Sequence, residues 1–252
     1  MTTIQGKRVY INGGTGGIGR ATAERLIGAG ARVFLSDVSD AVHGVAEEIG
    51  AVGAAVADVT NPAEVRASVN AAAERLGGLD GAFLNAGTEG KVSPIAELKP
   101  EDFRRVLDVN VFGVLHGLQA AIPHLAAAGG GSVVITGSVA SFIGSPGLTP
   151  YCTSKHALLG LMRSAAQELG ALGIRVNTVN PGPVDNRMME SIEHMAAPGA
   201  EGQVRAGFTA RVPLGRYARN EEVAAMVAFL LSDDSSYCNG NTFLVDGGMR
   251  SG

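Results

Sequence analysis

Short apolar runs alternate with longer stretches of helical periodicity along the whole chain. The apolar runs predict buried strands at 7–12, 32–37, 54–58, 81–85, 132–138, 174–180 and 242–245. The periodic stretches predict helices at 18–29, 41–49, 62–76, 101–125, 150–172 and 221–231. Strands separated by helices of this length are typical of right-handed βαβ units. We therefore expect an α/β fold over residues 1–252, a single domain with a doubly wound parallel sheet of about seven strands and helices on both faces.

One stretch, residues 182–219, shows neither pattern and is rich in Met, Gly, Pro and Ala. A connection of this length is uncommon in a compact domain unless it has a function. We therefore expect it to be an irregular loop that covers a substrate site, and we call it the lid segment. No second domain and no internal repeat is expected.

The composition and charge of the chain mainly exclude classes of function. The net charge is −4 and there is no basic run, so binding to nucleic acid or to an anionic membrane surface is not expected. No uncharged apolar run is long enough to span a membrane, and no signal-peptide pattern begins the chain, so a cytoplasmic location is expected. The two cysteines, Cys152 and Cys238, and the five scattered histidines predict neither a disulfide framework nor a metal site.

A glycine-rich turn follows the first predicted strand and leads directly into a helix. Such a turn lets the backbone approach a pyrophosphate and directs free helix N–H groups at it. The spacing Gly13-x-x-x-Gly17-x-Gly19 is one residue wider than G-x-G-x-x-G, and alone it is also compatible with a flexible turn. Its place between strand and helix, with Asp37 ending the next strand, favours a dinucleotide site of the Rossmann type.

The nature of the dinucleotide follows from Asp37. A carboxylate at this point accepts hydrogen bonds from both ribose hydroxyls of NAD and repels the 2′-phosphate of NADP. Neither Gly14 nor Val38 supplies a positive charge to hold that phosphate. The sequence therefore predicts NAD as the cofactor.

Tyr151 and Lys155 stand four residues apart in a predicted helix, so their side chains share one face. A nearby ammonium favours the phenolate, and we expect it to lower the pKa of Tyr151 from about 10 towards neutrality. A phenol tuned in this way can exchange a proton with an alcohol oxygen.

In this order, the motifs resemble those of the short-chain dehydrogenase/reductase family, over nearly the whole chain. Within the family, the stretches Asn85–Lys91 and Arg216–Tyr237 resemble the branch of levodione reductase and cyclic secondary-alcohol dehydrogenases. The family's T-G-x-x-x-G-x-G stands here as Asn12 to Gly19, with Asn in place of Thr. The other matches are Asp58-Val59, Asn85-Ala86-Gly87, Asn110, Ser138, Tyr151 with Lys155, and Pro181-Gly182-Pro183-Val184 followed by Asn186 where the family often has Thr.

The resemblance implies hydride transfer between C4 of a nicotinamide and a carbinol or carbonyl carbon. Tyr151 would be the acid/base, Lys155 would lower its pKa and hold the nicotinamide ribose, and Ser138 would bind the substrate oxygen. Asn110 would hold a water that links Lys155 to solvent. Cofactor contacts are implied at Gly13, Thr15, Gly17, Ile18, Gly19, Asp37, Asp58, Val59, Asn85, Ala86, Gly87, Tyr151, Lys155, Pro181, Gly182, Val184 and Asn186. The segments 221–231 and 244–248 resemble those that form the family's homotetramer.

Some residues have two interpretations. Asn110 lies on an apolar helical stripe, where its amide either serves the proposed water or is paired with neighbouring backbone. Glu89 and Lys91 either rim the substrate cleft or form an exposed surface pair. The residues Met188, Met189, Met195 and Phe208 either line an adaptable substrate pocket or simply pack the lid segment. Structural roles are expected for Cys152 and His156.

The main hypothesis is an NAD-dependent dehydrogenase of a secondary alcohol, or reductase of a ketone, with a small apolar or cyclic substrate. An NADPH-dependent 3-oxoacyl-carrier-protein reductase is an alternative, but no basic residue adjoins Asp37 and no basic patch is evident for an acidic carrier protein. A catalytically silent nucleotide-binding regulator is a third hypothesis. The presence of all four catalytic-type residues, Asn110, Ser138, Tyr151 and Lys155, disfavours it.

Overall fold

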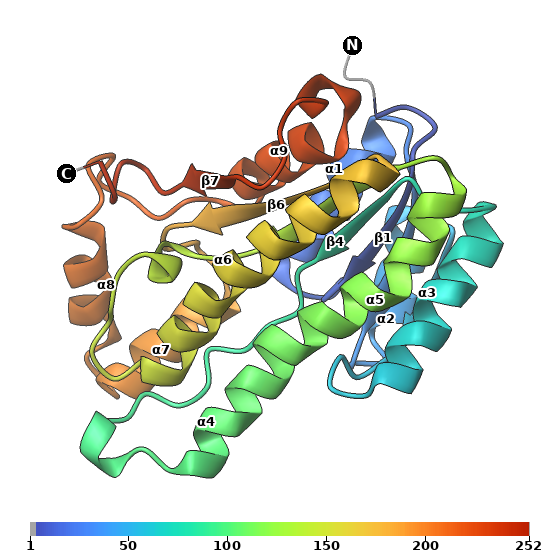
Figure 1. Ribbon diagram of the computed structural model, residues 1–252. Helices are drawn as coiled ribbons and strands as arrows, with labels where there is room; N and C mark the ends of the chain where they lie inside the picture. The colour runs from blue at the N-terminus through green and yellow to red at the C-terminus, as the bar shows by residue number, and fades with distance from the viewer. Residues whose placement is uncertain (1–3, 252) are drawn as a thin grey trace.

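Seven parallel strands form the centre of the protein, as seen in a computed structural model that describes residues 4–251 (Figure 1). The strands are β1 (Arg8–Asn12), β2 (Arg32–Asp37), β3 (Gly53–Val56), β4 (Gly81–Leu84), β5 (Gly131–Thr136), β6 (Ile174–Pro181) and β7 (Thr242–Val245). Their order in the sheet is β3-β2-β1-β4-β5-β6-β7. The winding direction therefore reverses between β1 and β4, where a crevice forms at the carboxyl ends of the strands.

Helices cover both faces of the sheet. One face carries α1 (Gly17–Gly28), α2 (Val42–Ile49) and α9 (Asn220–Leu231). The other carries α3 (Pro62–Leu76), α5 (Gly113–Ala127) and α6 (Thr149–Leu169), with α4 (Pro100–Leu107) continuing α5 through a π turn (Asp108–Phe112). Two more helices, α7 (Arg187–Ala196) and α8 (Glu201–Thr209), lie beyond the carboxyl ends of the strands (Figure 1). Short 3-10 turns occupy Ile95–Glu97, Val139–Ser141, Gly170–Leu172 and Asp233–Ser235.

The core has two layers because successive strand residues point to opposite faces. On β1, Tyr10 packs among the side chains of α3, α5 and α6, whereas Val9 and Ile11 pack against α1 and α9. The central strands are buried on both faces, which explains their short, mostly apolar sequences, whereas the edge strands β3 and β7 are only partly buried. The α/β class and the parallel sheet predicted from the sequence are therefore confirmed.

Two predictions about the elements need correction. The lid segment is not irregular, because it contains α7 and α8. Asn186 caps α7 by accepting a hydrogen bond from the backbone of Met188, and its glycine-rich and proline-rich flanks obscure this short helix in the sequence. The helix expected at 101–125 runs from Pro100 to Ala127 but contains the π turn at its middle.

The run from Pro100 to Ala127 is also, within the described residues, long and apolar enough to cross a membrane by length and composition alone. A core helix passes the same test. Here its second half packs against the sheet and α3, burying Val114, Leu118 and Leu125.

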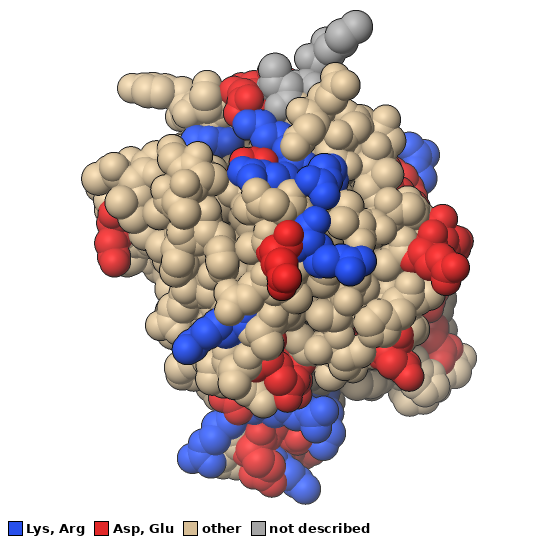
Figure 2. Space-filling model, turned by 90° about the vertical axis from the view of Figure 1, so that its right-hand side faces the viewer, with Lys and Arg blue, Asp and Glu red and all other residues tan. Residues whose placement is uncertain are grey.

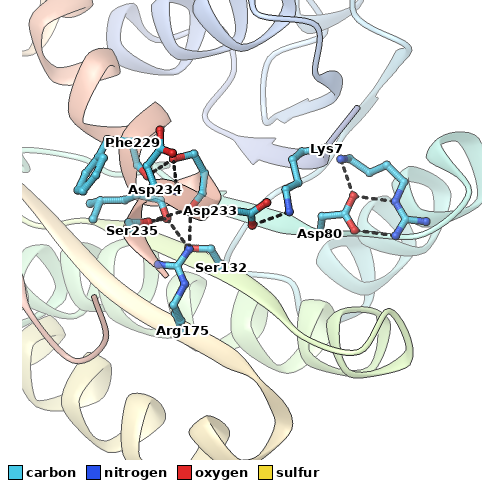
Figure 3. Close-up of polar contacts among 11 residues, drawn as sticks. Lys7, Asp80, Ser132, Arg175, Phe229, Asp233, Asp234 and Ser235 are labelled. Atoms are coloured by element: carbon cyan, nitrogen blue, oxygen red, sulfur yellow. Dashed lines mark hydrogen bonds and ion pairs between the residues drawn. The ribbon is translucent and has the colours of Figure 1, made fainter. Parts of the chain in front are cut away.

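Polar side chains form a set of contacts at the amino ends of the strands (Figure 3). The Arg175 guanidinium, on β6, donates to the carbonyls of Leu230 and Ser232 at the end of α9, at 3.0 and 3.1 Å. Lys7 forms an ion pair with the neighbouring Asp233 at 2.8 Å. Together with the hydroxyls of Ser132 and Ser235, Arg175 thus satisfies the last carbonyls of α9, which the helix itself leaves unpaired. On the face of the molecule that Figure 2 shows, Lys and Arg side chains are interspersed with Asp and Glu side chains.

Candidate active site

A cleft of about 1000 Å³ opens at the carboxyl ends of the strands, where the winding reverses. Most of the predicted site residues line it: Gly13, Thr15, Gly17, Ile18, Asp37, Asp58, Val59, Asn85, Ala86, Gly87, Ser138, Tyr151, Lys155, Pro181, Gly182, Val184 and Asn186. Gly19 and Asn110 are not among its lining residues. Residues predicted from separate motifs are therefore brought to one continuous cavity.

The glycine-rich turn between β1 and α1 forms one wall of the cleft. Gly16 is the N-cap of α1, with no capping side chain and no acidic residue in the first turn, so the helix N-terminus keeps its positive end free for an anion. Gly19 has a packing role instead, because a Cβ there would lie 2.1 Å from the carbonyl oxygen of Gly13. The geometry suits a pyrophosphate at the start of α1.

Asn12 joins the glycine-rich turn to the neighbouring strand end. Its buried side-chain oxygen accepts hydrogen bonds from the backbone N–H groups of Asn85 and Ala86, at 2.6 and 2.8 Å. The Asn85 side chain in turn donates to the carbonyl of Gly13 and accepts from the hydroxyl of Thr136. The sequence marks Asn12 only as a departure from the family's Thr, and its bridging contacts were not predicted.

Asp37 ends β2 and faces the cleft beside the exposed Val38. One carboxylate oxygen accepts hydrogen bonds from the backbone and the hydroxyl of Thr15, at 3.0 and 2.7 Å. The other oxygen accepts from the backbone of Ser39 at 3.1 Å. Asp37 is thereby held in place, with Thr15 as its immediate partner.

The other cleft residues come from the ends of β3, β4 and β6. Asp58 is held in a tight turn by the backbone and hydroxyl of Thr60, at 2.9 and 2.8 Å. On the opposite wall, the cleft runs along Pro181, Gly182 and Val184, and Asn186 caps α7 there. The long axis of the cleft thus extends from Asp37 and Asp58 towards the lid segment.

Tyr151, Lys155 and Ser138 meet in the inner part of the cleft. Tyr151 and Lys155 lie one turn apart on α6, and the Lys155 Nζ is 5.5 Å from the centre of the Tyr151 ring. All three side chains are buried, with at most 9% of each residue exposed. Ser138 forms a hydrogen bond with the Tyr151 phenol, and Lys155 donates to the carbonyl of Thr136 at 2.8 Å.

Burial dominates the proton equilibria of this pair. It raises the pKa of Tyr151 to about 12, while the hydrogen bond from Ser138 acts in the opposite direction. Burial also lowers the pKa of Lys155 to about 8, because no carboxylate compensates the ammonium. The expectation that Lys155 brings the pKa of Tyr151 towards neutrality is therefore wrong for this geometry, because the desolvation of the phenol dominates its pKa.

Asn110 lies in the π turn and is 1% exposed. Its side-chain oxygen accepts from the backbone of Thr88 at 2.8 Å, and its nitrogen donates to the Thr88 carbonyl and to the Ser154 hydroxyl. The side chain is therefore paired with protein groups, as the backbone-satisfied interpretation predicts. It still lies near Lys155, since a Cβ on Gly87 would be 3.2 Å from the Asn110 oxygen and 3.7 Å from the lysine nitrogen.

The residues beyond Gly87 divide between the core and the surface. Lys91 forms an exposed ion pair with Asp102 at 3.0 Å. Glu89, in contrast, is 5% exposed and forms an ion pair with Arg187, the first residue of α7, at 3.1 Å. The surface-pair interpretation is correct for Lys91 and wrong for Glu89. Nothing in the sequence indicates that the Glu89 side chain is buried.

The lid segment supplies apolar side chains to the outer end of the cleft. Its lining residues there are Met188, Met189, Ile192 and Phe208, and they adjoin the small cluster that contains Tyr151. Met195 does not line the cleft. Cys152 directly follows Tyr151 on α6, and burial raises the pKa of its thiol. His156 lies one turn further along the helix, and its ring forms a hydrogen bond with the Cys152 carbonyl.

Comparison with known proteins agrees with this geometry. A family model described as Enoyl-(Acyl carrier protein) reductase matches residues 13–250. Levodione reductase of Leifsonia aquatica is 39% identical, with 98% of this chain and 96% of that protein covered. Cyclohexanol dehydrogenase of Acinetobacter sp. (strain SE19) is 38% identical, covering 97% and 95%. A 3-oxoacyl-[acyl-carrier-protein] reductase of Thermotoga maritima is 34% identical, covering 98% of each chain.

The solved structure of levodione reductase superimposes with a TM-score of 0.94 at 38% identity, covering 98% of each chain. The fold and the cleft define an oxidoreductase that uses a nicotinamide cofactor and acts on a CH–OH group or the corresponding carbonyl. The chain belongs to the short-chain dehydrogenase/reductase family.

Proposed function

We propose that the protein is an NAD(H)-dependent dehydrogenase of a small, apolar or cyclic secondary alcohol, or a reductase of the corresponding ketone. One observation carries the proposal: Tyr151, Lys155 and Ser138 meet in a cleft that also contains the carboxylate of Asp37 and a free helix N-terminus. A proton donor and a dinucleotide cradle in one cavity are the two parts that hydride transfer to a carbonyl requires.

The cleft fits the cofactor along its length. The bare backbone at the start of α1 suits the pyrophosphate, and the Asp37 carboxylate suits the two hydroxyls of the adenosine ribose. Asp58 and Val59 would border the adenine, and Asn85, Ala86 and Gly87 would border the cofactor at the reversal point. No Lys or Arg stands at positions 14 or 38 to attract a 2′-phosphate, which supports NAD over NADP.

The chain's own residues would manage the proton and the substrate oxygen. The nicotinamide, when bound, accepts or supplies the hydride at its C4. Tyr151 would take the proton from the alcohol or return it to the carbonyl oxygen, and Ser138 would hold that oxygen by a hydrogen bond. Lys155 would hold the nicotinamide ribose and stabilise the phenolate. Asn110 would position the strand-end loop that closes over Lys155, and its role in holding a water stays a prediction.

The substrate would lie between Tyr151 and the lid segment. The thioether and aromatic side chains of Met188, Met189 and Phe208 form an adaptable apolar wall, and residues 182–219 would act as a lid over it. The names of levodione reductase and cyclohexanol dehydrogenase support a cyclic substrate.

A screen of secondary alcohols and ketones, followed by NADH absorbance at 340 nm, tests the proposal. Cyclohexanol, cyclic diketones and short linear secondary alcohols should be compared at equal concentration with NAD and with NADP. Turnover of at least one cyclic alcohol with NAD is expected. Absence of turnover in both directions with either cofactor would refute the proposed function.

A 3-oxoacyl-carrier-protein reductase remains the second candidate, favoured by the description of the family model and by the Thermotoga maritima relative. Asp37 and the apolar wall disfavour it. It predicts faster reduction of a 3-oxoacyl thioester than of a cyclic ketone, with NADPH preferred, and the same assay distinguishes the two.

We also propose a homotetramer in the cytoplasm. Large apolar side chains remain exposed on described surfaces, including Phe112 in the π turn and Leu244 on the edge strand β7, at 49% and 41%. Exposed apolar residues on an edge strand and a helix are typical of subunit contacts. Sedimentation velocity at micromolar concentration would give the mass directly, and a monomer would contradict the proposal.

A further inference from the structure

Glu89 is a buried carboxylate that the mechanism above does not use. It is 5% exposed and does not line the cleft, yet it lies close enough to Tyr151 for its charge to raise the pKa of the phenol. A carboxylate removed from water needs a partner that compensates its charge. That partner is Arg187, whose two terminal nitrogens lie 3.1 and 3.4 Å from the two carboxylate oxygens.

The carboxylate stands on a rigid loop. Both backbone polar groups of Thr88 are bonded to the buried Asn110, at 2.8 and 2.9 Å. Gly90 adopts a φ of +71°, and a Cβ there would lie 2.5 Å from the Val106 side chain on α4. The loop around Glu89 is therefore fixed to the body of the protein.

Arg187 belongs to a different part of the chain. It begins α7, its side chain is 73% exposed and lines the cleft, and its partner lies 98 residues earlier. The far end of α7 is held separately, because Glu193 accepts a hydrogen bond from Tyr217 at 2.8 Å and lies 3.8 Å from Arg205 on α8. Those contacts join parts of the lid segment to each other, whereas the Glu89–Arg187 pair joins the lid segment to the fixed loop.

We propose that the Glu89–Arg187 pair is a latch that holds the first turn of α7 over the cleft and makes proton transfer at Tyr151 depend on the position of the lid segment. With the latch closed, Arg187 offsets part of the charge of Glu89. With the latch open, an uncompensated carboxylate remains beside the phenol and opposes its ionisation. Closing the latch thus weakens the electrostatic opposition to phenolate formation, while the apolar side chains of α7 add to the burial of the phenol. This inference rests on the proposed acid/base role of Tyr151, and Glu89 and Arg187 are positioning residues in it.

The charged and titratable groups that face the phenol are few. On its own helix they are Lys155 and Cys152, and from the fixed loop Glu89. From α7, Arg187 acts through Glu89, and the Ser138 hydroxyl bonds the phenol directly. A change in the pH profile of a latch variant can therefore be attributed to Glu89 or Arg187, because the other groups around the phenol are unchanged.

Two single substitutions break the latch but change the charge beside Tyr151 in opposite directions. Glu89→Gln removes the negative charge, so the rise of kcat/KM for alcohol oxidation should move to lower pH by about 0.5 units or more. Arg187→Gln leaves Glu89 uncompensated, so the rise should move to higher pH by a similar amount. The double variant should follow Glu89→Gln. KM should increase several-fold in all three.

Lys91→Gln is the matched control, because it breaks the exposed Lys91–Asp102 pair on the same loop. It should leave the profile and KM unchanged. Equal losses of activity in both latch variants, with no shift or with shifts in the same direction, would reduce the pair to a structural contact and overturn the proposal.

Two further measurements do not require turnover. Hydrogen exchange of the amides at 187–196 should accelerate at least several-fold in both latch variants and stay as in the wild type in Lys91→Gln. Phenolate absorbance at 295 nm, taken as the difference from Tyr151→Phe, should shift in opposite directions in the two latch variants. If the wild type oxidises no alcohol, the proposed function is refuted, but the hydrogen exchange and the phenolate absorbance still show whether the Glu89–Arg187 pair acts as a latch. Unchanged exchange, or phenolate shifts in one direction, would contradict it.

Discussion

Asn12 Oδ1 lies 2.6 Å from the backbone nitrogen of Asn85, so the ends of two neighbouring strands are joined by a side chain at the point where the sheet reverses its winding. The same oxygen accepts from Ala86, and Asn12 is 2% exposed. One buried acceptor thus satisfies two backbone donors at the wall of the cleft. The relative position of the glycine-rich turn and of Asn85–Gly87 depends on it.

Replacing Asn12 by Ala should therefore be costly. Two N–H groups lose their acceptor, and each unsatisfied donor costs about 1–3 kcal/mol, so the free energy of unfolding should fall by roughly 2–6 kcal/mol. Urea unfolding followed by circular dichroism measures it. Asn12→Asp keeps the acceptor oxygen and is the control. A loss below 1 kcal/mol in Asn12→Ala would show that the bridge is not needed.

Lys155 makes the stability of the protein depend on pH. Burial lowers its pKa in the folded protein from 10.5 to about 8, so between these values the unfolded chain binds more protons than the folded one. The free energy of unfolding therefore rises with pH through this window, by an amount on the order of 3 kcal/mol from this residue. Below pH 8 the buried ammonium reduces stability by that amount.

Urea titrations at pH 7.5 and 10 should show this rise in the wild type and a much smaller one in Lys155→Met. Lys99→Met, at an exposed position, serves as the control and should behave like the wild type. Tyr151 acts at higher pH and in the opposite direction: because burial raises its pKa to about 12, its contribution to stability is lost as the pH rises through that value. An equal pH dependence in Lys155→Met and wild type would contradict the assignment.

Removing the Tyr151 hydroxyl should stop the reaction while leaving the cofactor bound. Tyr151→Phe keeps the ring in its apolar cluster, so the affinity for NADH should stay within about threefold. Turnover should fall about 100-fold or more, the usual contribution of a positioned acid/base. Tyr237→Phe, at a fully exposed tyrosine, is the control for both measurements. Residual activity within tenfold of the wild type would exclude Tyr151 as the acid/base.

Asp37 should determine the choice of cofactor. Asp37→Asn removes the charge that opposes a 2′-phosphate but keeps an oxygen for Thr15. The ratio of the NADPH to the NADH dissociation constant should fall about tenfold or more, as measured by cofactor fluorescence. The control is Asp40→Asn, an exposed carboxylate nearby. Tighter binding of NADPH than of NADH by the wild type would refute the role of Asp37.

The parts of the structure that could be predicted are those with local causes. Asn61 followed by Pro62 marks the start of α3, where the Asn side chain accepts from the backbone of Ala63 and Glu64, and the helix has the predicted bounds. Strand β2 also begins and ends where its apolar run does. Ser138 and Asp37, predicted from separate motifs, line one cleft because parallel strands all end at the same side of the sheet, and Tyr151 of α6 lines it with them.

The parts that could not be predicted depend on contacts between distant residues. The partner of Glu89 lies 98 residues further along the chain, and the partner of Asn110 in the Thr88 backbone is 22 residues away. The expected pKa of Tyr151 was wrong for a related reason. Helical spacing reveals that Lys155 is near, but the apolar side chains that bury the phenol also come from α7 and from the turn at Ala140, which the helix sequence does not contain.

Helix α6 holds Tyr151 and Lys155 and is anchored in the core through Leu158, Met162 and Leu169. The apolar wall that faces the substrate belongs instead to α7 and α8, and the Glu89–Arg187 ion pair joins α7 to the body of the protein. Mutations that reshape the wall therefore leave the backbone of α6 in place, and they reach Tyr151 through its burial, since the wall packs against that side chain. Over evolutionary time such a chain can acquire new substrates by small steps, each of which preserves a working catalyst, and laboratory libraries confined to the wall should inherit the same tolerance.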